Sequence, residues 1–222
     1  MTTVLAVTGL SREAKIIAGP GVVTMVSGGA IKQLSEAIEA ALPPHCAGII
    51  SIGIAGALDP ALKVGDAVVA SEVVAGDRRI ATGAAWSERL RAALPEARLG
   101  AVLGSNTMVA DGSAKARLHQ ATGALSVDME SHVAAEAAGR HSLPFAVLRF
   151  ISDDASRALP KAAQAGMKPD GGMDLAAVLR SLAADPRQLP ALIRTGAEAE
   201  TAFRALLRGR RRLGPALGLA DV

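Results

Sequence analysis

The segment from Ser126 to Ser156 constrains the fold more than any other part of this 222-residue chain. It contains FAVLRFI, a continuous apolar run from Phe145, whose length and β-branched content are typical of a strand buried on both faces. Before this run, small and apolar residues recur at helical spacing, and Gly139 stands where a helix can end in a left-handed turn. The segment therefore predicts a strand, a helix that ends near Arg140, and a second strand.

Acidic residues stand at both ends of this unit. Glu130, in the sequence DMES, opens the predicted helix, while Ser152, Asp153 and Asp154 follow the buried strand directly. In open α/β sheets ligands bind at the carboxyl ends of the strands, because the loops there are exposed and the strands beneath hold them rigidly. We therefore expect a ligand site at this edge of the sheet.

The rest of the chain alternates between strand-like and helix-like segments. Strands are predicted at 3–9, 22–29, 48–56, 67–74, 98–105 and 124–130. Helices are predicted from Ser11, as a cap, to 18, and at 30–42, 86–93, 113–121, 175–184 and 187–208. This alternation predicts a single-domain α/β fold with a central mixed, mostly parallel sheet flanked by helices on both sides.

The C-terminal end carries most of the basic excess of the chain. Six arginines lie between Arg194 and Arg212, next to an apolar helix face that includes Phe203, Leu206 and Leu207. We expect a domain over residues 1–208 and a basic, mobile tail over 209–222. Two readings stay open: the helix and its arginines contact an anionic membrane, or the apolar face packs on the core and the arginines are solvated.

Composition excludes several classes of protein. Aromatic residues make up 2% of the chain and tyrosine is absent, which argues against base-stacking platforms and hence against a nucleic-acid partner. The lone Cys46 excludes internal disulfides, and no Cys/His spacing suits a metal site. The start has no basic leader, and no segment reaches the roughly 20 apolar residues of a spanning helix, so we expect a cytoplasmic protein.

Three motifs in order resemble the superfamily of nucleoside phosphorylases and methylthioadenosine/S-adenosylhomocysteine nucleosidases. They are SIGIAGALDPALKVGDAVVASEVV, VDMES and RFISD, and the resemblance covers residues 4 to about 156. The ending DLAAVLRSLAADPRQLPALIR is most similar to the hopanoid-associated phosphorylase subgroup, to which removal of adenine from adenosylhopane has been assigned. The resemblance implies cleavage of the N-glycosidic bond of an adenine nucleoside, no cofactor apart from phosphate as a co-substrate if phosphate is used, and a homodimer or larger homo-oligomer.

For the end of the last strand, the resemblance implies that Asp153 is the general acid that delivers a proton to N7 of the purine. Protonating the base lowers the barrier because the leaving purine anion is a poor leaving group. It also implies that Ser152 bonds the base edge, and that Met108 and Val109 pack against the purine. From the residues alone, Asp153 could equally cap the following segment.

At the start of the preceding helix, the resemblance makes Glu130 the acceptor of hydrogen bonds from the ribose hydroxyls, with Met129 against the sugar. The alternative is a first-turn carboxylate that interacts with the helix dipole. Gly28, Gly29 and Gly53 are candidates for backbone that approaches phosphate or ribose closely, although tight turns alone would explain them.

Glu13 aligns with the glutamate that nucleosidases use to activate water, where hexameric phosphorylases carry a phosphate-binding arginine. Read alone, it belongs to a solvated helix face. In phosphorylases an arginine and a serine are two further phosphate ligands, and these positions fall on Ser51 and Ile54 in this chain. The chain therefore departs from the phosphorylase pattern. Ile54 also departs from the serine that nucleosidases carry. Whether water or phosphate attacks is therefore left open, as is the choice among adenosylhopane cleavage, methylthioadenosine/S-adenosylhomocysteine hydrolysis and general purine nucleoside phosphorolysis.

Two other classes of function are less favoured. A nucleoside-binding module without catalysis would have no need of an acid, so Glu13, Glu130 and Asp153 together favour an enzyme. A dinucleotide-dependent oxidoreductase lacks its glycine-rich fingerprint, and no P-loop is present. Arg149, inside the apolar strand, is predicted to be a buried charge paired with a carboxylate.

Overall fold

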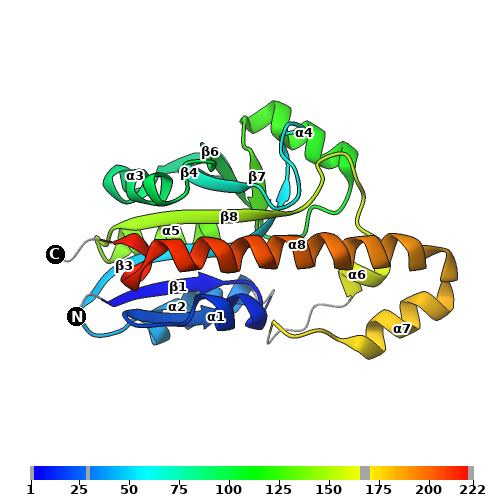
Figure 1. The fold of residues 1–222 in the computed structure, drawn as a ribbon, viewed down its shortest axis with the longest axis horizontal. Helices are drawn as coiled ribbons and strands as arrows, with labels where there is room; N and C mark the ends of the chain where they lie inside the picture. The colour runs from blue at the N-terminus through cyan, green and yellow to red at the C-terminus, as the bar shows by residue number, and fades with distance from the viewer. Residues whose placement is uncertain (1–2, 29–30, 166–170, 220–222) are drawn as a thin grey trace.

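An eight-stranded mixed sheet forms the centre of the protein in this computed structural model, which describes residues 3–28, 31–165 and 171–219 (Figure 1). The strands are β1 (Thr3–Thr8), β2 (Val22–Val26), β3 (Cys46–Ala57), β4 (Ala67–Ala75), β5 (Arg78–Ala81), β6 (Arg98–Gly104), β7 (Ser126–Asp128) and β8 (Phe145–Asp153). Parallel pairs are β1–β2, β1–β3, β3–β8, β4–β6 and β6–β7, and antiparallel pairs are β3–β7, β4–β5 and β4–β8. The predicted mixed, mostly parallel sheet is confirmed.

Strand β8 closes the sheet on itself. The strand order is β2-β1-β3-β7-β6-β4-β5, and β8 pairs with both β3 and β4, so that β3, β8, β4, β6 and β7 form a ring. The run Phe145–Ile151 of β8 is buried throughout, because β8 has a strand on each edge and helices on its faces. This position explains its continuous apolar sequence.

Helices cover both sides of the sheet and complete its two larger hydrophobic cores. One core packs α1 (Ser11–Ile17), α3 (Ala84–Ala93) and α8 (Leu189–Leu213) on the sheet, and the other packs α2 (Ile31–Ala41) and α5 (Ser131–Arg140). The remaining helices are α4 (Gly112–Thr122), α6 (Lys161–Ala165), α7 (Leu175–Ala184) and the 3-10 turns η1 (Pro186–Gln188) and η2 (Pro215–Gly218). The single α/β domain that the alternation predicts is therefore present.

The sequence pattern does not predict two short elements of the fold. The strand β5, RRIA, lacks the apolar alternation of a strand and forms by pairing antiparallel with β4 across a turn in which Gly76 has φ +61°. The helix α6 has only five residues. Both are too short and too polar to give a periodic signal.

The capping residues predicted for two helices were wrong. Ser11 does not cap α1; the helix starts at Ser11, Leu10 precedes it, and the Leu10 N–H donates to the Glu13 carboxylate at 2.8 Å. The helix α5 does end at Arg140, but Gly139 is helical and the positive φ, 53°, belongs to Ser142.

The C-terminal end differs from the predicted tail. The boundary expected at residue 208 lies inside α8, which continues to Leu213, and the side chains of Leu213 and Leu217 are buried. Gly209 allows this packing, since a Cβ there would lie 2.5 Å from the Phe150 ring of β8. The Trp86 indole also donates to the Leu217 carbonyl at 2.9 Å. Residues 209–219 therefore belong to the domain.

Within the described part of the chain, no helix is long and apolar enough to cross a bilayer.

Candidate active site

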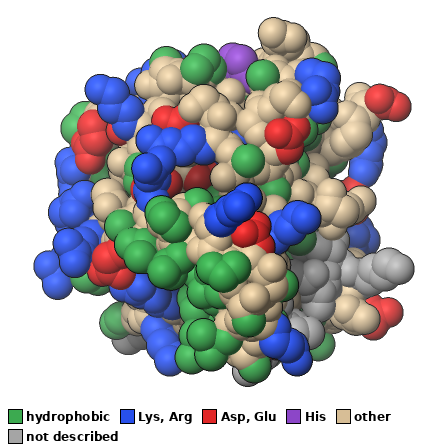
Figure 2. All heavy atoms as spheres, turned by 90° about the vertical axis from the view of Figure 1, so that its right-hand side faces the viewer, with side chains coloured by type: hydrophobic (Ala, Val, Ile, Leu, Met, Phe, Trp, Pro, Cys, Tyr) green, Lys and Arg blue, Asp and Glu red, His purple; other side chains and the backbone are tan. Residues whose placement is uncertain are grey.

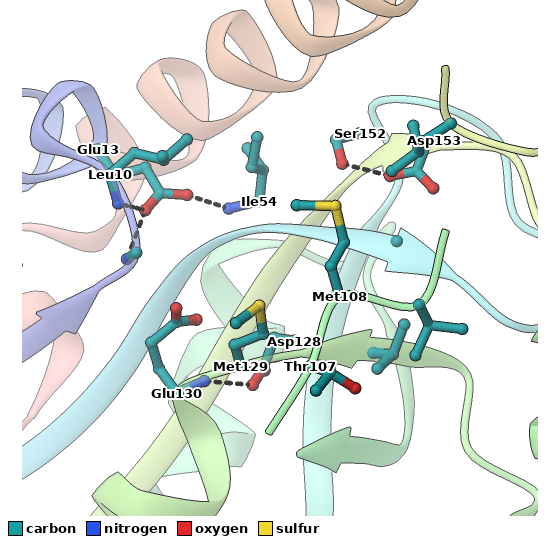
Figure 3. Close-up of a pocket in the computed structure, with 15 residues that line it drawn as sticks. Leu10, Glu13, Ile54, Thr107, Met108, Asp128, Met129, Glu130, Ser152 and Asp153 are labelled. Atoms are coloured by element: carbon teal, nitrogen blue, oxygen red, sulfur yellow. Dashed lines mark hydrogen bonds between the residues drawn. The ribbon is translucent and has the colours of Figure 1, made fainter. Parts of the chain in front are cut away.

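A pocket opens at the ends of strands β3, β7 and β8, beside the residues that follow β1 (Figure 3). The sequence predicts a ligand site at such strand ends in an α/β sheet. Its lining residues are Gly9, Leu10, Glu13, Ile54, Gly56, Thr107, Met108, Val109, Val127, Asp128, Met129, Glu130, Ser152, Asp153 and Leu159. Segments far apart in sequence thus meet at one place. Seven of the predicted site residues are among them: Glu13, Met108, Val109, Met129, Glu130, Ser152 and Asp153.

Glu13 turns inward from α1 and lies at one side of the pocket (Figure 3). It is 1% exposed, and its carboxylate accepts three backbone hydrogen bonds, from Gly9 (2.8 Å), Leu10 (2.8 Å) and Ile54 (2.7 Å). Burial, reinforced by the nearby Glu130 charge, raises the pKa of Glu13 to about 7. The expectation of a solvated helix face is excluded, because a buried carboxylate needs such donors.

Glu130 lies at the N-terminus of α5 within a buried polar network. Its carboxylate accepts a hydrogen bond from the Ser27 hydroxyl at 2.9 Å and lies 3.5 Å from Nη2 of Arg149. Arg149 also donates through Nε to Asp128 at 2.7 Å, which confirms the predicted buried arginine paired with a carboxylate. Burial raises the pKa of Glu130, Arg149 opposes that rise, and the charge of Asp128 adds to it. Arg149, beneath the pocket, thus holds two of the carboxylates that line it close together.

Asp153 ends β8 on the opposite side of the pocket from Glu13 (Figure 3). One carboxylate oxygen accepts from the hydroxyl of Ser152 at 2.7 Å, and the other is ion-paired with Nζ of Lys115. The side chain of Asp153 is 10% exposed, whereas that of Lys115 is 0% exposed. The pocket therefore gives access to Asp153 but not to the lysine behind it.

The glycines predicted to approach a ligand have other neighbours. A Cβ on Gly53 would lie 2.4 Å from the Glu13 carboxylate, so this glycine makes room for Glu13. Gly28 has φ +55° and donates its N–H to the Gly9 carbonyl at 3.1 Å, and it does not line the pocket. Gly29 lies outside the described residues.

Sequence reasoning missed Gly9, Asp128 and Lys115. Gly9 follows β1, and a Cβ there would lie 2.9 Å from Glu130 Oε1 and 3.5 Å from Glu13 Oε2. The signal was available for Gly9, the glycine that ends the strand predicted at 3–9. For Lys115 there was none, because a lysine in the polar helix GSAKARLHQAT looks solvated.

The pocket is acidic. Four carboxylates line it and, among the described residues that line it, none is a lysine or arginine. Ser51 and Ile54 are the two positions that depart from the phosphorylase pattern. The Ser51 hydroxyl accepts a hydrogen bond from Arg149 beneath the site, and the Ile54 N–H donates to the Glu13 carboxylate. In the described ranges no three His, Cys, Asp or Glu residues are grouped to hold a metal ion.

Comparison with known proteins gives one family. The family model described as "Phosphorylase superfamily" matches residues 7–184. Among curated proteins, none matches the chain by sequence.

Solved structures with the same fold include nucleosidases. A mutant methylthioadenosine nucleosidase of Helicobacter pylori, with 5′-methylthioadenosine in its active site, has a TM-score of 0.63 at 16% identity, covering 94% of this chain and 98% of that one. The 5′-methylthioadenosine/S-adenosylhomocysteine nucleosidase of S. pneumoniae has a TM-score of 0.61 at 17% identity, covering 94% and 99%. Futalosine hydrolase of Helicobacter pylori has 0.61 at 18%, covering 83% and 100%. At these identities the likeness concerns the fold.

Proposed function

Since the chain belongs to the phosphorylase superfamily, we propose that it is an enzyme that cleaves the N-glycosidic bond of adenine nucleosides with water as the attacking group. The observation that carries this proposal is the pair of carboxylates on opposite sides of one pocket, Glu13 held by backbone N–H groups and Asp153 held by Lys115. Hydrolysis of a purine nucleoside needs a proton donor at the purine and a general base that activates water at the sugar carbon, and two such carboxyl groups can fill these roles.

Asp153 is the proposed general acid. As the bond between ribose and purine breaks, its electron pair moves into the base, and a proton on N7 turns the base into a neutral leaving group. The partial exposure of Asp153 to the pocket and its place at a strand end support this role. Ser152, which bonds the Asp153 carboxylate, fixes the orientation of that group.

Glu13 is the proposed base for water. A base works best when its pKa lies near the pH of the reaction, and the pKa of Glu13 is about 7. Its three backbone donors hold the carboxylate still, so that it can accept a proton from a water molecule next to the sugar.

Glu130 is the proposed ribose ligand. Its carboxylate can accept hydrogen bonds from the two sugar hydroxyls, and the ionic network beneath it fixes the acceptor in place. Met129 borders the sugar side, and Met108 with Val109 borders the purine. Figure 3 shows Met108 between the Glu13 and Asp153 sides, where a flat base would contact it.

Electrostatics favours water over phosphate. An inorganic phosphate ion in the pocket would meet four carboxylates, and the two cations that pair with them, Arg149 and Lys115, are fully buried and do not line the pocket. Water carries no such penalty. Phosphorolysis, the alternative that the subgroup name suggests, would need the glycines at 28 and 29 and nearby amides as its anion site.

The test is base release from methylthioadenosine, adenosylhomocysteine, inosine and adenosylhopane, with and without phosphate. We expect adenine release in phosphate-free buffer with free ribose, or its 5′-substituted form, as the second product. Strict dependence on phosphate with a ribose 1-phosphate product would overturn the hydrolytic mechanism, and release of hypoxanthine alone would overturn the preference for adenine.

For the 5′ substituent, the proposal includes an apolar group of the adenosylhopane type. Leu10 and Met129 give the pocket apolar walls beside the proposed sugar site. Relative kcat/KM values for nucleosides with progressively longer alkyl groups at the 5′ position measure this preference. A preference for an unsubstituted hydroxyl would contradict it.

A homo-oligomer is also proposed, as the family resemblance implies. Light scattering of the purified protein measures the assembly directly, and a monomer at micromolar concentration would contradict it.

The proposal also includes peripheral membrane contact, but through another surface than the C-terminal arginines. Phe203 and Leu206 are buried on the core and Leu207 is 38% exposed, so most of the apolar face of α8 beside the C-terminal arginines is occupied. The stretch 173–197, which we name the α7–α8 hairpin, instead exposes a set of large apolar side chains. They are Met173, Leu175, Leu179, Leu189 and Ile193.

Basic side chains flank these residues. Arg180, Arg187 and Arg194 are exposed on the α7–α8 hairpin, and Figure 2 shows hydrophobic and basic groups together on this face of the molecule. Each basic residue near an anionic leaflet contributes about 1 kcal/mol. A variant with Leu175, Leu179 and Ile193 changed to Ser should sediment less with anionic liposomes and still cleave soluble nucleosides. R208E/R211E is the matched control. If only that variant loses sedimentation, the C-terminal arginines and not the α7–α8 hairpin contact the membrane.

A further inference from the structure

Lys115 is a fully buried lysine whose ammonium protons have no role in the proposed mechanism so far. It lies on α4, whose N-terminus is capped by Asp111, which accepts from the Ala114 N–H at 3.0 Å. The capped helix directs Lys115 inward, where its side chain is 0% exposed. A buried ammonium group is costly unless it is paired and hydrogen-bonded, so its partners define its role.

All three protons of the ammonium group have acceptors. Nζ of Lys115 donates to the carbonyls of Asp154 at 2.9 Å and Arg157 at 3.4 Å, and to Oδ2 of Asp153. The two carbonyls would suffice to anchor the loop after β8. The third acceptor, the carboxylate that neutralises the buried charge, is also the group that faces the substrate pocket.

In this arrangement both oxygens of Asp153 accept hydrogen bonds. Oδ1 receives the Ser152 hydroxyl and Oδ2 receives Lys115. N7 of a purine is also an acceptor, so Asp153 can bond it only after a proton reaches the carboxylate. The lysine ammonium is a far stronger acid than the serine hydroxyl, and it already points a proton at Oδ2.

Resting on the proposed function, we infer that Lys115 is a positioning residue that supplies, through Asp153, the proton taken by the leaving purine. The N-glycosidic bond breaks and its electron pair enters the base. N7 takes a proton from the Asp153 carboxyl, and Asp153 takes one from Nζ of Lys115, which becomes a neutral amine. After the base leaves, solvent in the open pocket returns a proton through Asp153 to Lys115.

The test measures kcat of Lys115→Met and Lys115→Arg on nucleosides whose released base becomes progressively more acidic. The nucleosides are adenosine, 2-chloroadenosine, 2-fluoroadenosine and 8-azaadenosine. A base that is more acidic needs a proton less, so the loss of rate should shrink along the series. We expect Lys115→Met to lose about 10²-fold or more in kcat on adenosine, and much less on the most acidic base. Lys115→Arg keeps the positive charge but releases no proton, so it should follow the same trend.

The controls separate this role from a structural one. Arg117→Met, an exposed change on the same helix, should behave as the wild type on every substrate. Thermal melting and the affinity for a non-cleavable adenosine analogue check that each variant is folded, and Lys115→Gln replaces any variant that is not.

Three outcomes overturn the inference. A uniform loss across the series would make Lys115 a structural anchor, and wild-type rates in Lys115→Arg would leave it a purely electrostatic one. A wild type that cleaves neither these nucleosides nor the 5′-substituted adenine nucleosides of the activity test would remove the proposed function and this inference together. Failure of the inference alone is recognised by an active wild type.

Discussion

The two sides of the pocket hold their carboxylates by different means. Glu13 is held by backbone N–H groups from two separate segments, and its pKa is about 7. Asp153 is held by a buried lysine and a serine. Backbone dipoles orient a carboxylate without supplying a mobile proton, whereas an ammonium group carries one. The difference teaches that two acidic side chains in one pocket can serve as base and acid because their partners differ.

The largest expected effect is that of Asp153→Asn. An amide cannot relay a proton to N7, so base release should fall by about 10²–10⁴-fold. The affinity for a non-cleavable adenosine analogue should stay within about tenfold, because a lost acid acts on the reaction step rather than on binding. Single-turnover release of adenine measures the effect. Turnover like that of the wild type would remove the acid from Asp153 and with it the comparison.

Glu13→Gln should come next, with a loss of about 10²-fold in base release. Because this change affects the attack of water and not the departure of the base, the loss should be the same for adenosine and for 2-fluoroadenosine. In Asp153→Asn, by contrast, the loss should shrink for the more acidic base. If both variants respond alike to the acidity of the base, the two sides of the pocket do not have separate roles.

The pH dependence gives a smaller effect on the Glu13 side. The base must be ionised to accept a proton, so kcat/KM should rise with pH through the pKa of Glu13, about 7. One unit below that value the rate should be about tenfold lower than on the plateau. The residual activity of Glu13→Gln should lack this rise. A rise that persists in the variant would assign it to another group, such as Glu130.

Ser152→Ala should give the smallest effect. It removes the hydroxyl that bonds Oδ1 of Asp153 but leaves Lys115 in place to hold the carboxylate, so adenosine cleavage should fall only about three- to tenfold, the scale of the net contribution of a typical hydrogen bond. The same change should hardly affect 2-fluoroadenosine. A loss as large as that of Asp153→Asn would mean that Ser152, and not Lys115, controls the acid.

Much of the fold and part of the site followed from the sequence. The apolar run of β8 predicted a doubly buried strand, and its last residues predicted polar groups at the carboxyl edge of a sheet, where Ser152 and Asp153 are found. Glu130 followed likewise from the start of the helix α5. These predictions succeeded because periodic burial is a local property, readable from neighbours along the chain.

The partners of the buried charges were decided by the tertiary structure. Glu13 looked solvated on a helix of mixed residues, yet Ile54, 41 positions away, donates to it. Lys115 looked solvated as well, and its carboxylate partner lies 38 positions away. The arginine-rich sequence predicted a mobile tail at the end of α8, although Gly209 and Leu213 pack on the domain. Sequence pattern reports which residues avoid water, whereas the donor or cation that makes a buried carboxylate stable comes from distant segments, which only the folded chain brings together.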